Sequence, residues 1–281
     1  MKRWTLFAAL ALALVIAVLA GCSSLDERQR AWIFQPSDRS WAGGLAAADG
    51  MDDVWIGFSA KSGGQLSTLH GLWLPADKPQ APVLLYLHGA RYNVTGSAPR
   101  MRHMQQLGFS VLAVDYRGFG KSTQALPSEE SAYEDARSAW DWLATHYPDR
   151  PRYIFGHSLG GPIAIQLASE VGDEAGTIVE GTFTSIADVV SSSKWGWMPV
   201  SLFITQRFDA VRRVDKIGSP LLVVHGGQDR LILPDLGRKL YEAAAQPKLF
   251  MLVEGGSHHN TNTVGQAQYG KALAQLFNIQ Q

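Results

Sequence analysis

The stretch Gly156-His157-Ser158-Leu159-Gly160 places a serine between two glycines, after the apolar run RYIF and before the helix-forming run GGPIAIQLASEV. A serine in this setting lies on a sharp turn from strand to helix, where side chains at the glycine positions would collide with neighbouring backbone. The N-terminus of the helix that follows stabilises negative charge. We therefore predict that Ser158 is a nucleophile. The alternative is a glycine-rich helix cap with an exposed serine.

A nucleophilic serine needs a base to take its proton, and the base needs a third group to orient it. Asp229 follows the apolar run PLLVVHG in a glycine-rich turn, and His258 follows the run KLFMLVEG in a turn of the same kind. The two residues therefore become the candidate acid and the candidate base.

The candidate base has an adjacent rival, His259. Neighbouring side chains in an extended loop point in different directions, so only one of His258 and His259 can meet both Ser158 and Asp229. A metal site would need further spaced His, Cys or carboxylate ligands, and we find no such set in the sequence. We therefore predict one catalytic histidine and no metal.

These residues sit in a chain where short apolar runs alternate with helical patterns. The predicted strands cover 54–60, 66–75, 81–89, 109–118, 152–156, 176–181, 220–226 and 248–255, and the predicted helices cover 99–108, 129–147, 160–171, 233–244 and 264–279. The first two strands flank the turn cluster KSGG and predict a hairpin. Strands without polar faces that alternate with helices predict an α/β fold, in which helices cover both faces of a mostly parallel sheet of about eight strands.

Five landmarks occur in order from about residue 52 to the end: HGARYN, DYRGFGKS, GHSLGG, HGGQDRLI and GGSHHN. Together with the chain order Ser158, Asp229, His258 they resemble serine hydrolases of the α/β-hydrolase fold. The resemblance is strongest to a compact, small-lidded branch with esterase or thioesterase character. In this family the catalytic histidine follows glycine and one or two small residues and often precedes Asn, which favours His258 over His259.

The same resemblance implies an oxyanion hole made of two backbone N–H groups. These belong to Ala90, which follows His88 and Gly89, and to Leu159, which follows the nucleophile. Two preorganised donors would stabilise the tetrahedral oxyanion. Many relatives have Asn at position 90, but the side chain does not matter for an N–H donor. For Asp115, a rival carboxylate in DYRGFGKS, we predict a structural role.

A lid is expected at about residues 185–217, within a predicted hydrolase domain of residues 51–281. The segment is rich in large apolar side chains, namely Trp195, Trp197, Met198, Leu202 and Phe203. It either forms a small lid that lines an acyl or aromatic pocket, or packs onto the core as an ordinary helix.

The N-terminus has the layout of a bacterial secretion signal: the basic start MKRW, the uncharged run TLFAALALALVIAVLA and then LAGC. LAGC resembles a lipobox, which implies a signal peptide at residues 1–21 and a lipidated Cys22 that carries acyl chains such as palmitate. Residues 22–50 are predicted to be a tether and irregular lead-in. By resemblance to bacterial lipoproteins, Ser23 and Ser24 favour the outer membrane, facing the periplasm. The alternatives are a simple membrane anchor or an ordinary signal peptide with a stray cysteine.

Composition narrows the function further. The 281 residues carry 25 basic and 25 acidic side chains, and without a long basic run we expect no nucleic-acid partner. We predict a cofactor-free serine hydrolase that cleaves esters or thioesters through an acyl-enzyme and is anchored to the envelope. The alternatives are a prolyl-aminopeptidase-like peptidase and a non-catalytic lipoprotein that uses the fold for binding. The acyl group, the leaving group and the oligomeric state are left open.

Overall fold

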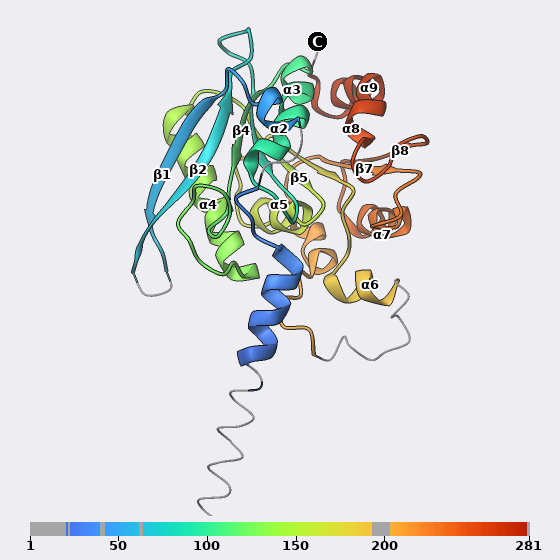
Figure 1. Cartoon of the computed structure of the whole chain (residues 1–281). Coiled ribbons are helices and arrows are strands. Elements are labelled where there is room, and N and C mark those ends of the chain that lie inside the picture. The colour runs from blue at the N-terminus through green and yellow to red at the C-terminus, as the bar shows by residue number, and fades with distance from the viewer. Residues whose placement is uncertain (1–20, 22, 40–42, 62–63, 193–202, 280–281) are drawn as a thin grey trace, which may run out of the picture.

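The apolar runs predicted as strands form one eight-stranded sheet (Figure 1). The structure is a computed structural model and describes residues 21, 23–39, 43–61, 64–192 and 203–279. The strands are β1 (Asp52–Ser59), β2 (Leu66–Leu74), β3 (Val83–Leu87), β4 (Ser110–Val114), β5 (Arg152–His157), β6 (Gly176–Glu180), β7 (Leu221–Gly226) and β8 (Lys248–Val253).

The strand order is β1-β2-β4-β3-β5-β6-β7-β8. β1 pairs with β2, and β2 with β4, in antiparallel fashion, whereas every pair from β4 to β8 is parallel. Each residue of β3, β4, β6 and β7 is buried. Helices on both faces exclude water from parallel strands, which explains why these strands lack a polar face. The predicted, mostly parallel sheet is confirmed.

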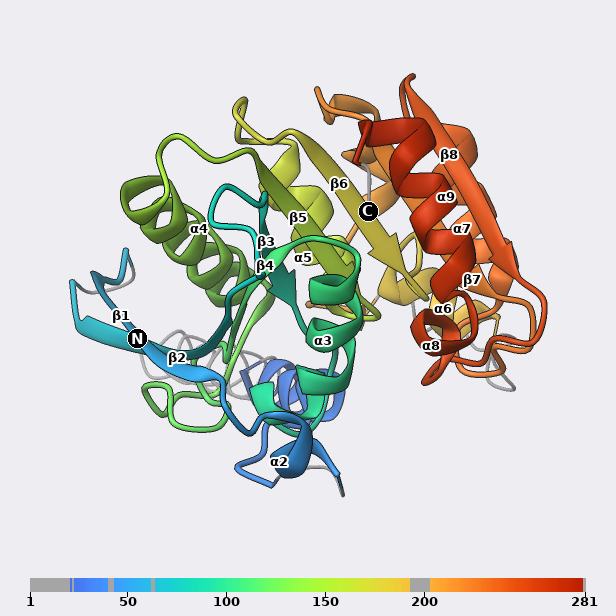
Figure 2. The ribbon, with the colours of Figure 1, turned by 90° about the horizontal axis from the view of Figure 1, so that it is seen from above.

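Helices cover both faces of the sheet and produce two layers of core (Figure 2). The helices are α2 (Gly44–Ala47), α3 (Ala98–Gln106), α4 (Glu129–His146), α5 (Gly160–Ala168), α6 (Ile186–Ser191), α7 (Pro234–Ala243), α8 (Thr261–Val264) and α9 (Gln266–Phe277). Helices α4, α5 and α7 pack on one face, and α3 and α9 pack on the other. The 3₁₀ turns are η1 (Val94–Ser97), η3 (Ala210–Arg212) and η4 (Val214–Lys216).

Helix α4 shows how local sequence sets an element. Ser128 caps its N-terminus, since its hydroxyl accepts the N–H of Ser131 at 3.1 Å. Glu129 and Glu130 follow in the first turn, where the helix dipole favours acids. The apolar positions Trp140 and Leu143 are buried against the sheet. The helix predicted over residues 129–147 is thus confirmed.

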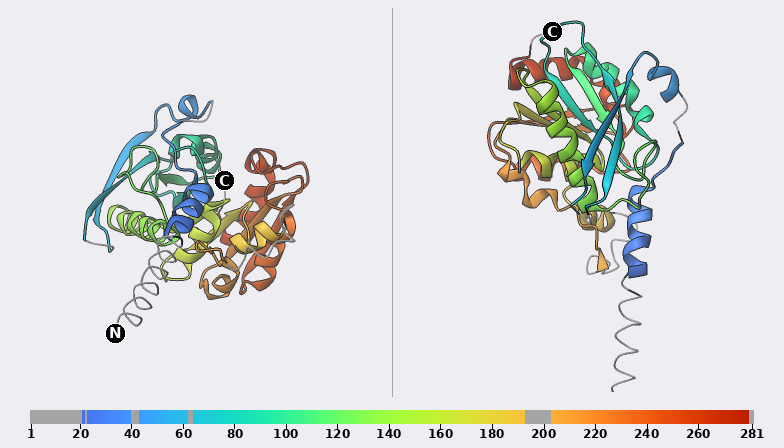
Figure 3. Two further views of the ribbon diagram at one scale, coloured as in Figure 1. Left: turned by 60° about the horizontal axis from the view of Figure 1, so that its bottom comes forward. Right: turned by 90° about the vertical axis from the view of Figure 1, so that its left-hand side faces the viewer.

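The N-terminal segment departs from the expected tether. Residues 23–34 are helical and lie at the same end of the molecule as the chain that resumes at residue 203 (Figure 3). Phe34 is fully buried, with ring centroids 6.4 Å from Phe119 and 5.8 Å from Phe208. The end of this segment is therefore part of the core, because moving an apolar aromatic side chain out of water lowers the free energy of the folded state. Cys22 and residues 1–20 lie outside the described residues. In the described part of the chain, no helix is both long and apolar enough to cross a bilayer.

The predicted lid region is described only at its two ends. Helix α6 forms its N-terminal end, and the chain from residue 203, with η3 and η4, forms its C-terminal end. Phe208 and Val214 are buried in the core, whereas Phe203 is 64% exposed. The C-terminal end of this region thus packs onto the core, which agrees with the second of the two interpretations, ordinary packing. Trp195, Trp197, Met198 and Leu202 lie outside the described residues.

Candidate active site

Ser158 occupies the turn between β5 and α5. Its φ angle is +55°, a left-handed conformation that a non-glycine residue rarely adopts and that is strained. Two glycines make the turn possible: a Cβ at position 156 would lie 2.3 Å from the Gly160 carbonyl oxygen, and one at position 160 would lie 2.0 Å from the Leu87 carbonyl oxygen. The predicted reason for glycine at both positions is confirmed.

Hydrogen bonds hold this turn at the end of the sheet. The Ser158 N–H donates to the carbonyl of Glu180 at 3.0 Å. The Ser158 carbonyl accepts the N–H of Gly161 and the hydroxyl of Thr182, both at 2.9 Å. The side-chain hydroxyl is thereby left at the tip of the turn, free to contact another element.

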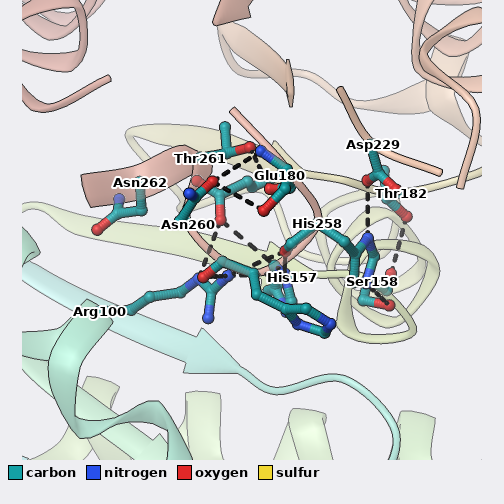
Figure 4. A network of polar contacts seen from close by, with 12 residues as sticks. Arg100, His157, Ser158, Glu180, Thr182, Asp229, His258, Asn260, Thr261 and Asn262 are labelled. Carbon is teal, nitrogen blue, oxygen red and sulfur yellow. Dashed lines mark hydrogen bonds and ion pairs between the residues drawn. The ribbon is translucent and has the colours of Figure 1, made fainter. Parts of the chain in front are cut away.

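The structure brings Ser158, His258 and Asp229 together (Figure 4). His258 Nε2 lies 3.0 Å from the Ser158 hydroxyl oxygen, and His258 Nδ1 lies 2.7 Å from Asp229 Oδ2. The three residues follow the carboxyl ends of β5, β8 and β7, respectively. A hydroxyl, an imidazole and a carboxylate in this relay have the geometry of a serine nucleophile, a general base and an orienting acid.

Asp229 is buried and saturated with donors. Its Oδ1 accepts the N–H groups of Leu231 and Ile232, each at 2.9 Å, and its Oδ2 faces His258. His225 Nε2 lies 3.5 Å from the same Oδ2. Burial alone would raise the pKa of Asp229, but hydrogen bonds from His225 and His258 outweigh burial and hold the pKa well below its usual range. The carboxylate is therefore charged and able to stabilise a cationic imidazole.

The two adjacent histidines point to different places. His258 is 6% exposed and meets both Ser158 and Asp229, whereas His259 is exposed. Their rings are almost perpendicular, with an interplanar angle of 87°. The geometry therefore assigns the position between hydroxyl and carboxylate to His258.

The two segments that carry the predicted oxyanion-hole N–H groups lie beside Ser158. Leu159 is adjacent to Ser158, and Gly89, which precedes Ala90, lies so close that an added Cβ would be 3.0 Å from the Ser158 Cβ. Within the described residues the amides of Ala90 and Leu159 have no hydrogen-bond acceptor. They remain available for a developing oxyanion, and their catalytic role remains a prediction.

The rival polar residues near the site have structural partners. The carboxylate of Asp115 is buried and accepts the N–H of Val94 at 2.7 Å, so it fixes the turn that begins η1. The Nδ1–H of His88 donates to the Gly89 carbonyl at 2.7 Å, next to the predicted oxyanion hole. The Arg91 guanidinium donates to the side chain of Gln35 at 2.8 Å. Over the described residues, no cluster of three or more potential metal ligands is present.

Arg100, for which the sequence predicts no role, lies within the same network as the triad (Figure 4). Its guanidinium donates to the carbonyl oxygens of both His258 and His259, at 3.2 and 3.1 Å. In sequence, Arg100 is one of several basic residues in a polar helical pattern, and only its burial distinguishes it.

Comparisons with known proteins agree with this geometry. The family model described as serine aminopeptidase, S33, matches residues 77–208. The esterase Pf2001 of Pyrococcus furiosus superposes with a TM-score of 0.66, at 19% identity over 86% of this chain and 98% of that one. The chain has the α/β-hydrolase fold.

Two curated proteins are similar to this α/β-hydrolase chain in sequence. The uncharacterized protein Rv2307c of Mycobacterium tuberculosis is 32% identical over 181 residues, which are 64% of this chain and 63% of that protein. The lysophosphatidylserine lipase ABHD12 of Danio rerio is 32% identical over an alignment 186 residues long, which covers 59% of this chain and 48% of that protein. The chain thus spans between about half and somewhat under two thirds of these relatives' lengths.

Proposed function

We propose that this protein is a serine hydrolase that cleaves carboxylic ester or thioester bonds through an acyl-enzyme. The observation that carries the proposal is the relay from the Ser158 hydroxyl through His258 to Asp229, with distances of 3.0 and 2.7 Å. The similarity to proteins named as an esterase and a lipase supports it.

The proposed reaction follows from the site geometry. The Ser158 oxygen attacks the carbonyl carbon while His258 Nε2 takes the hydroxyl proton, and the Asp229 carboxylate stabilises the resulting imidazolium. The N–H groups of Ala90 and Leu159 bind the oxyanion of the tetrahedral intermediate. His258 then protonates the alcohol or thiol as it leaves. A water molecule, deprotonated by His258, attacks the acyl-serine and releases the acid.

A fluorophosphonate probe tests the nucleophile. The chain starting at Ser23 should gain the mass of the phosphonyl group on the peptide that holds Ser158, and Ser158→Ala should not label although it remains folded by circular dichroism. A folded wild-type protein that fails to label would refute the enzyme proposal and favour a binding module. A chain-length series of p-nitrophenyl esters and acyl-thioesters would then define the acyl preference.

A peptidase is the second candidate, because the matching family model is described as a serine aminopeptidase. An aminopeptidase needs a carboxylate for the substrate amine. One buried carboxylate beside the triad, Glu180, is already bound by Arg100 and Tyr269. We therefore favour ester cleavage. Aminoacyl p-nitroanilides turned over faster than the esters would reverse this preference.

We also propose that the enzyme is held on the bacterial envelope by a lipidated Cys22. We expect the anchor to lie in the outer membrane, with the protein facing the periplasm. The LAGC sequence supports this. So do exposed apolar side chains near that end of the chain: Leu25 and Trp32, seven residues apart on one helical face, and Phe203, whose carbonyl accepts the Gln29 side chain at 2.7 Å. Mass spectrometry should find a diacylated or triacylated Cys22 at the mature N-terminus. A Cys22→Ser protein that stays with the membrane after a salt wash would count against the anchor.

A further inference from the structure

Arg100 links helix α3 to the loop that carries the predicted base. Its side chain is only 14% exposed, and its Nη2 atom lies within hydrogen-bond distance of the carbonyl oxygens of His258 and His259. One guanidinium therefore binds the backbone carbonyls of two successive residues, the predicted base and the histidine after it. A planar fork of donors on a rigid helix can fix such a pair of carbonyls in one orientation.

Other hydrogen bonds attach the loop on either side of these two carbonyls. The Gly256 carbonyl accepts the Gln228 N–H at 2.8 Å, and the Asn262 side-chain oxygen lies 2.8 Å from His103 Nδ1 on α3. Within the turn the bonds are local: the N–H and hydroxyl of Ser257 donate to the Asn260 side chain at 2.7 and 2.8 Å. These local bonds shape the turn but do not tie the carbonyls of His258 and His259 to the sheet. Among the described residues, Arg100 is the cation that joins the carbonyls of His258 and His259 to the body of the protein.

A buried carboxylate neutralises Arg100. Glu180 is 0% exposed at the end of β6, and its Oε1 accepts the Nε–H of Arg100 at 2.9 Å. Its Oε2 accepts the hydroxyl of Tyr269 at 2.5 Å. Burial, and then the charge of Glu180, raise the pKa of Tyr269 well above its usual range, so this hydroxyl stays protonated and keeps donating. Because both carboxylate oxygens are satisfied, the ion pair can remain inside the protein.

The same glutamate also holds the nucleophile. The backbone carbonyl of Glu180 accepts the Ser158 N–H at 3.0 Å, and Glu180 pairs with His157 in the register of β5 and β6. One residue therefore fixes the serine turn through its backbone and, through Arg100, the loop of the base. The distance between the Ser158 hydroxyl and the imidazole of His258 depends on both connections.

His157 completes the contact between the two turns. Its Nε2 lies 3.1 Å from Arg100 Nη2 and 3.1 Å from the His258 carbonyl oxygen. Burial lowers the pKa of His157 well below its usual range, and the charge of Arg100 lowers it further. In a neutral imidazole, Nε2 either accepts from Arg100 or, when it carries the proton, donates to the His258 carbonyl, whereas a cationic imidazole would be repelled by Arg100.

We propose that Arg100, paired with Glu180, is a positioning residue that holds the carbonyls of His258 and His259 so that the His258 imidazole faces Ser158 and His259 faces solvent. The inference rests on the proposed serine hydrolase function. It adds a role for a residue that touches neither the substrate nor the reacting atoms and acts through the backbone of the base.

The chain offers a matched control on the same helix. Arg102 also binds two backbone carbonyls, those of Ala47 and Asp49, which belong to the end of α2 and the turn that follows it and not to the base loop. Arg100→Met should lower kcat for a p-nitrophenyl ester by about 10²-fold with little change in KM, because a base misplaced by about 1 Å loses that much rate. Arg102→Met should lower Tm but keep kcat within about twofold.

Two further measurements keep the proposal testable if Arg100→Met does not fold or the protein does not hydrolyse esters. Arg100→Lys keeps a cation beside Glu180 but cannot span the carboxylate and both carbonyls, so it should fold with an intermediate loss of kcat. Hydrogen exchange of the peptide covering residues 255–262 should accelerate in Arg100→Lys and not in Arg102→Met, with or without enzymatic activity.

The outcomes separate the two proposals. An active wild-type enzyme whose folded Arg100 variants keep full kcat and unchanged exchange at residues 255–262 would overturn the positioning role. An equal loss of kcat in Arg102→Met would overturn it too, since the effect would then be general destabilisation. An inactive wild type with faster loop exchange in the Arg100 variants would overturn the proposed function and leave the positioning role supported.

Discussion

The imidazole of His258 has one partner on each ring nitrogen. Nδ1 faces the charged carboxylate of Asp229, so this nitrogen carries the proton, and Nε2 is then the acceptor for the Ser158 hydroxyl. This tautomer is the one that a general base requires. His259, one residue further on, has neither partner and lies exposed.

The first prediction at this scale compares the two histidines. His258→Ala should lower kcat on the order of 10⁴-fold or more, because it removes the proton acceptor of the nucleophile. His259→Ala is the matched control and should keep kcat within a few-fold of the wild type. Steady-state kinetics on one ester would decide. A dead His259→Ala enzyme beside an active His258→Ala enzyme would move the base by one residue.

The second prediction concerns acid stability. Hydrogen bonds from His225 and His258 hold the folded-state pKa of Asp229 below its usual range, against the opposing effect of burial. The unfolded value is about 3.9, so the charged carboxylate stabilises the fold above about pH 4, and this contribution is lost as pH falls towards the folded-state pKa. The Tm difference between wild type and Asp229→Asn should therefore shrink from pH 5 to pH 3. Thermal melts at several pH values would measure it, and a constant difference would contradict the assignment.

At the scale of elements, the junction of β5 and α5 has the least room for change. Position 160 faces the backbone of β3, where even a methyl group would lie 2.0 Å from the Leu87 carbonyl oxygen. Helix α5 can begin directly after the nucleophile only because this position lacks a side chain. The exposure of the Ser158 hydroxyl therefore depends on the close approach of α5 to β3.

Substitution tests this close approach. Gly160→Ala should destabilise the fold by about 1–3 kcal/mol, as overpacking does, and should lower kcat because the serine turn must move. Gly172→Ala is the control: no atom lies within 4 Å of its added Cβ, and its Tm and kcat should stay near the wild-type values. Equal Tm and kcat for the two variants would show that the contact with Leu87 is unimportant.

At the scale of the whole molecule, the folded unit extends upstream of the predicted domain start at residue 51. The helical segment 23–34 ends in the buried Phe34, and its Gln29 side chain accepts the N–H of Thr205 at 2.9 Å. This N-terminal segment is therefore hydrogen-bonded to the C-terminal part of the predicted lid region. If Cys22 carries the anchor, little free tether separates the membrane from the fold.

Two aromatic residues in this segment give contrasting expectations. Phe34→Ala should destabilise the protein by about 3–5 kcal/mol, because it leaves a cavity between Phe119 and Phe208. Trp32→Ala removes a larger ring that is 66% exposed, and it should change the free energy of unfolding by no more than about 0.5 kcal/mol. Urea unfolding of the chain starting at Ser23 would compare them. Equal effects would mean that the segment is not docked on the core.

The features predicted from sequence are those set by residues close together in the chain. Apolar runs predicted the parallel strands, since burial on both faces leaves a strand without polar positions. The turn cluster KSGG predicted the hairpin of β1 and β2, of which β1 is largely exposed. The strand–Gly-x-Ser-x-Gly–helix pattern predicted the serine turn, because five consecutive residues carry its signature. The contact that requires glycine at position 160 is with Leu87 in another strand. The start of α4 at residue 129 was also predicted from its own stretch of sequence.

What the tertiary structure decided depends on contacts between distant residues. The family resemblance favoured His258, but only the loop's position over Ser158 and Asp229 shows which ring faces inward. Arg100 and Glu180 are 80 residues apart, and each looks like an ordinary surface charge in its own stretch of sequence. Burial of a charged pair is a property of the assembled layers, because it depends on which helix covers which strand end. No local pattern in the sequence encodes that choice.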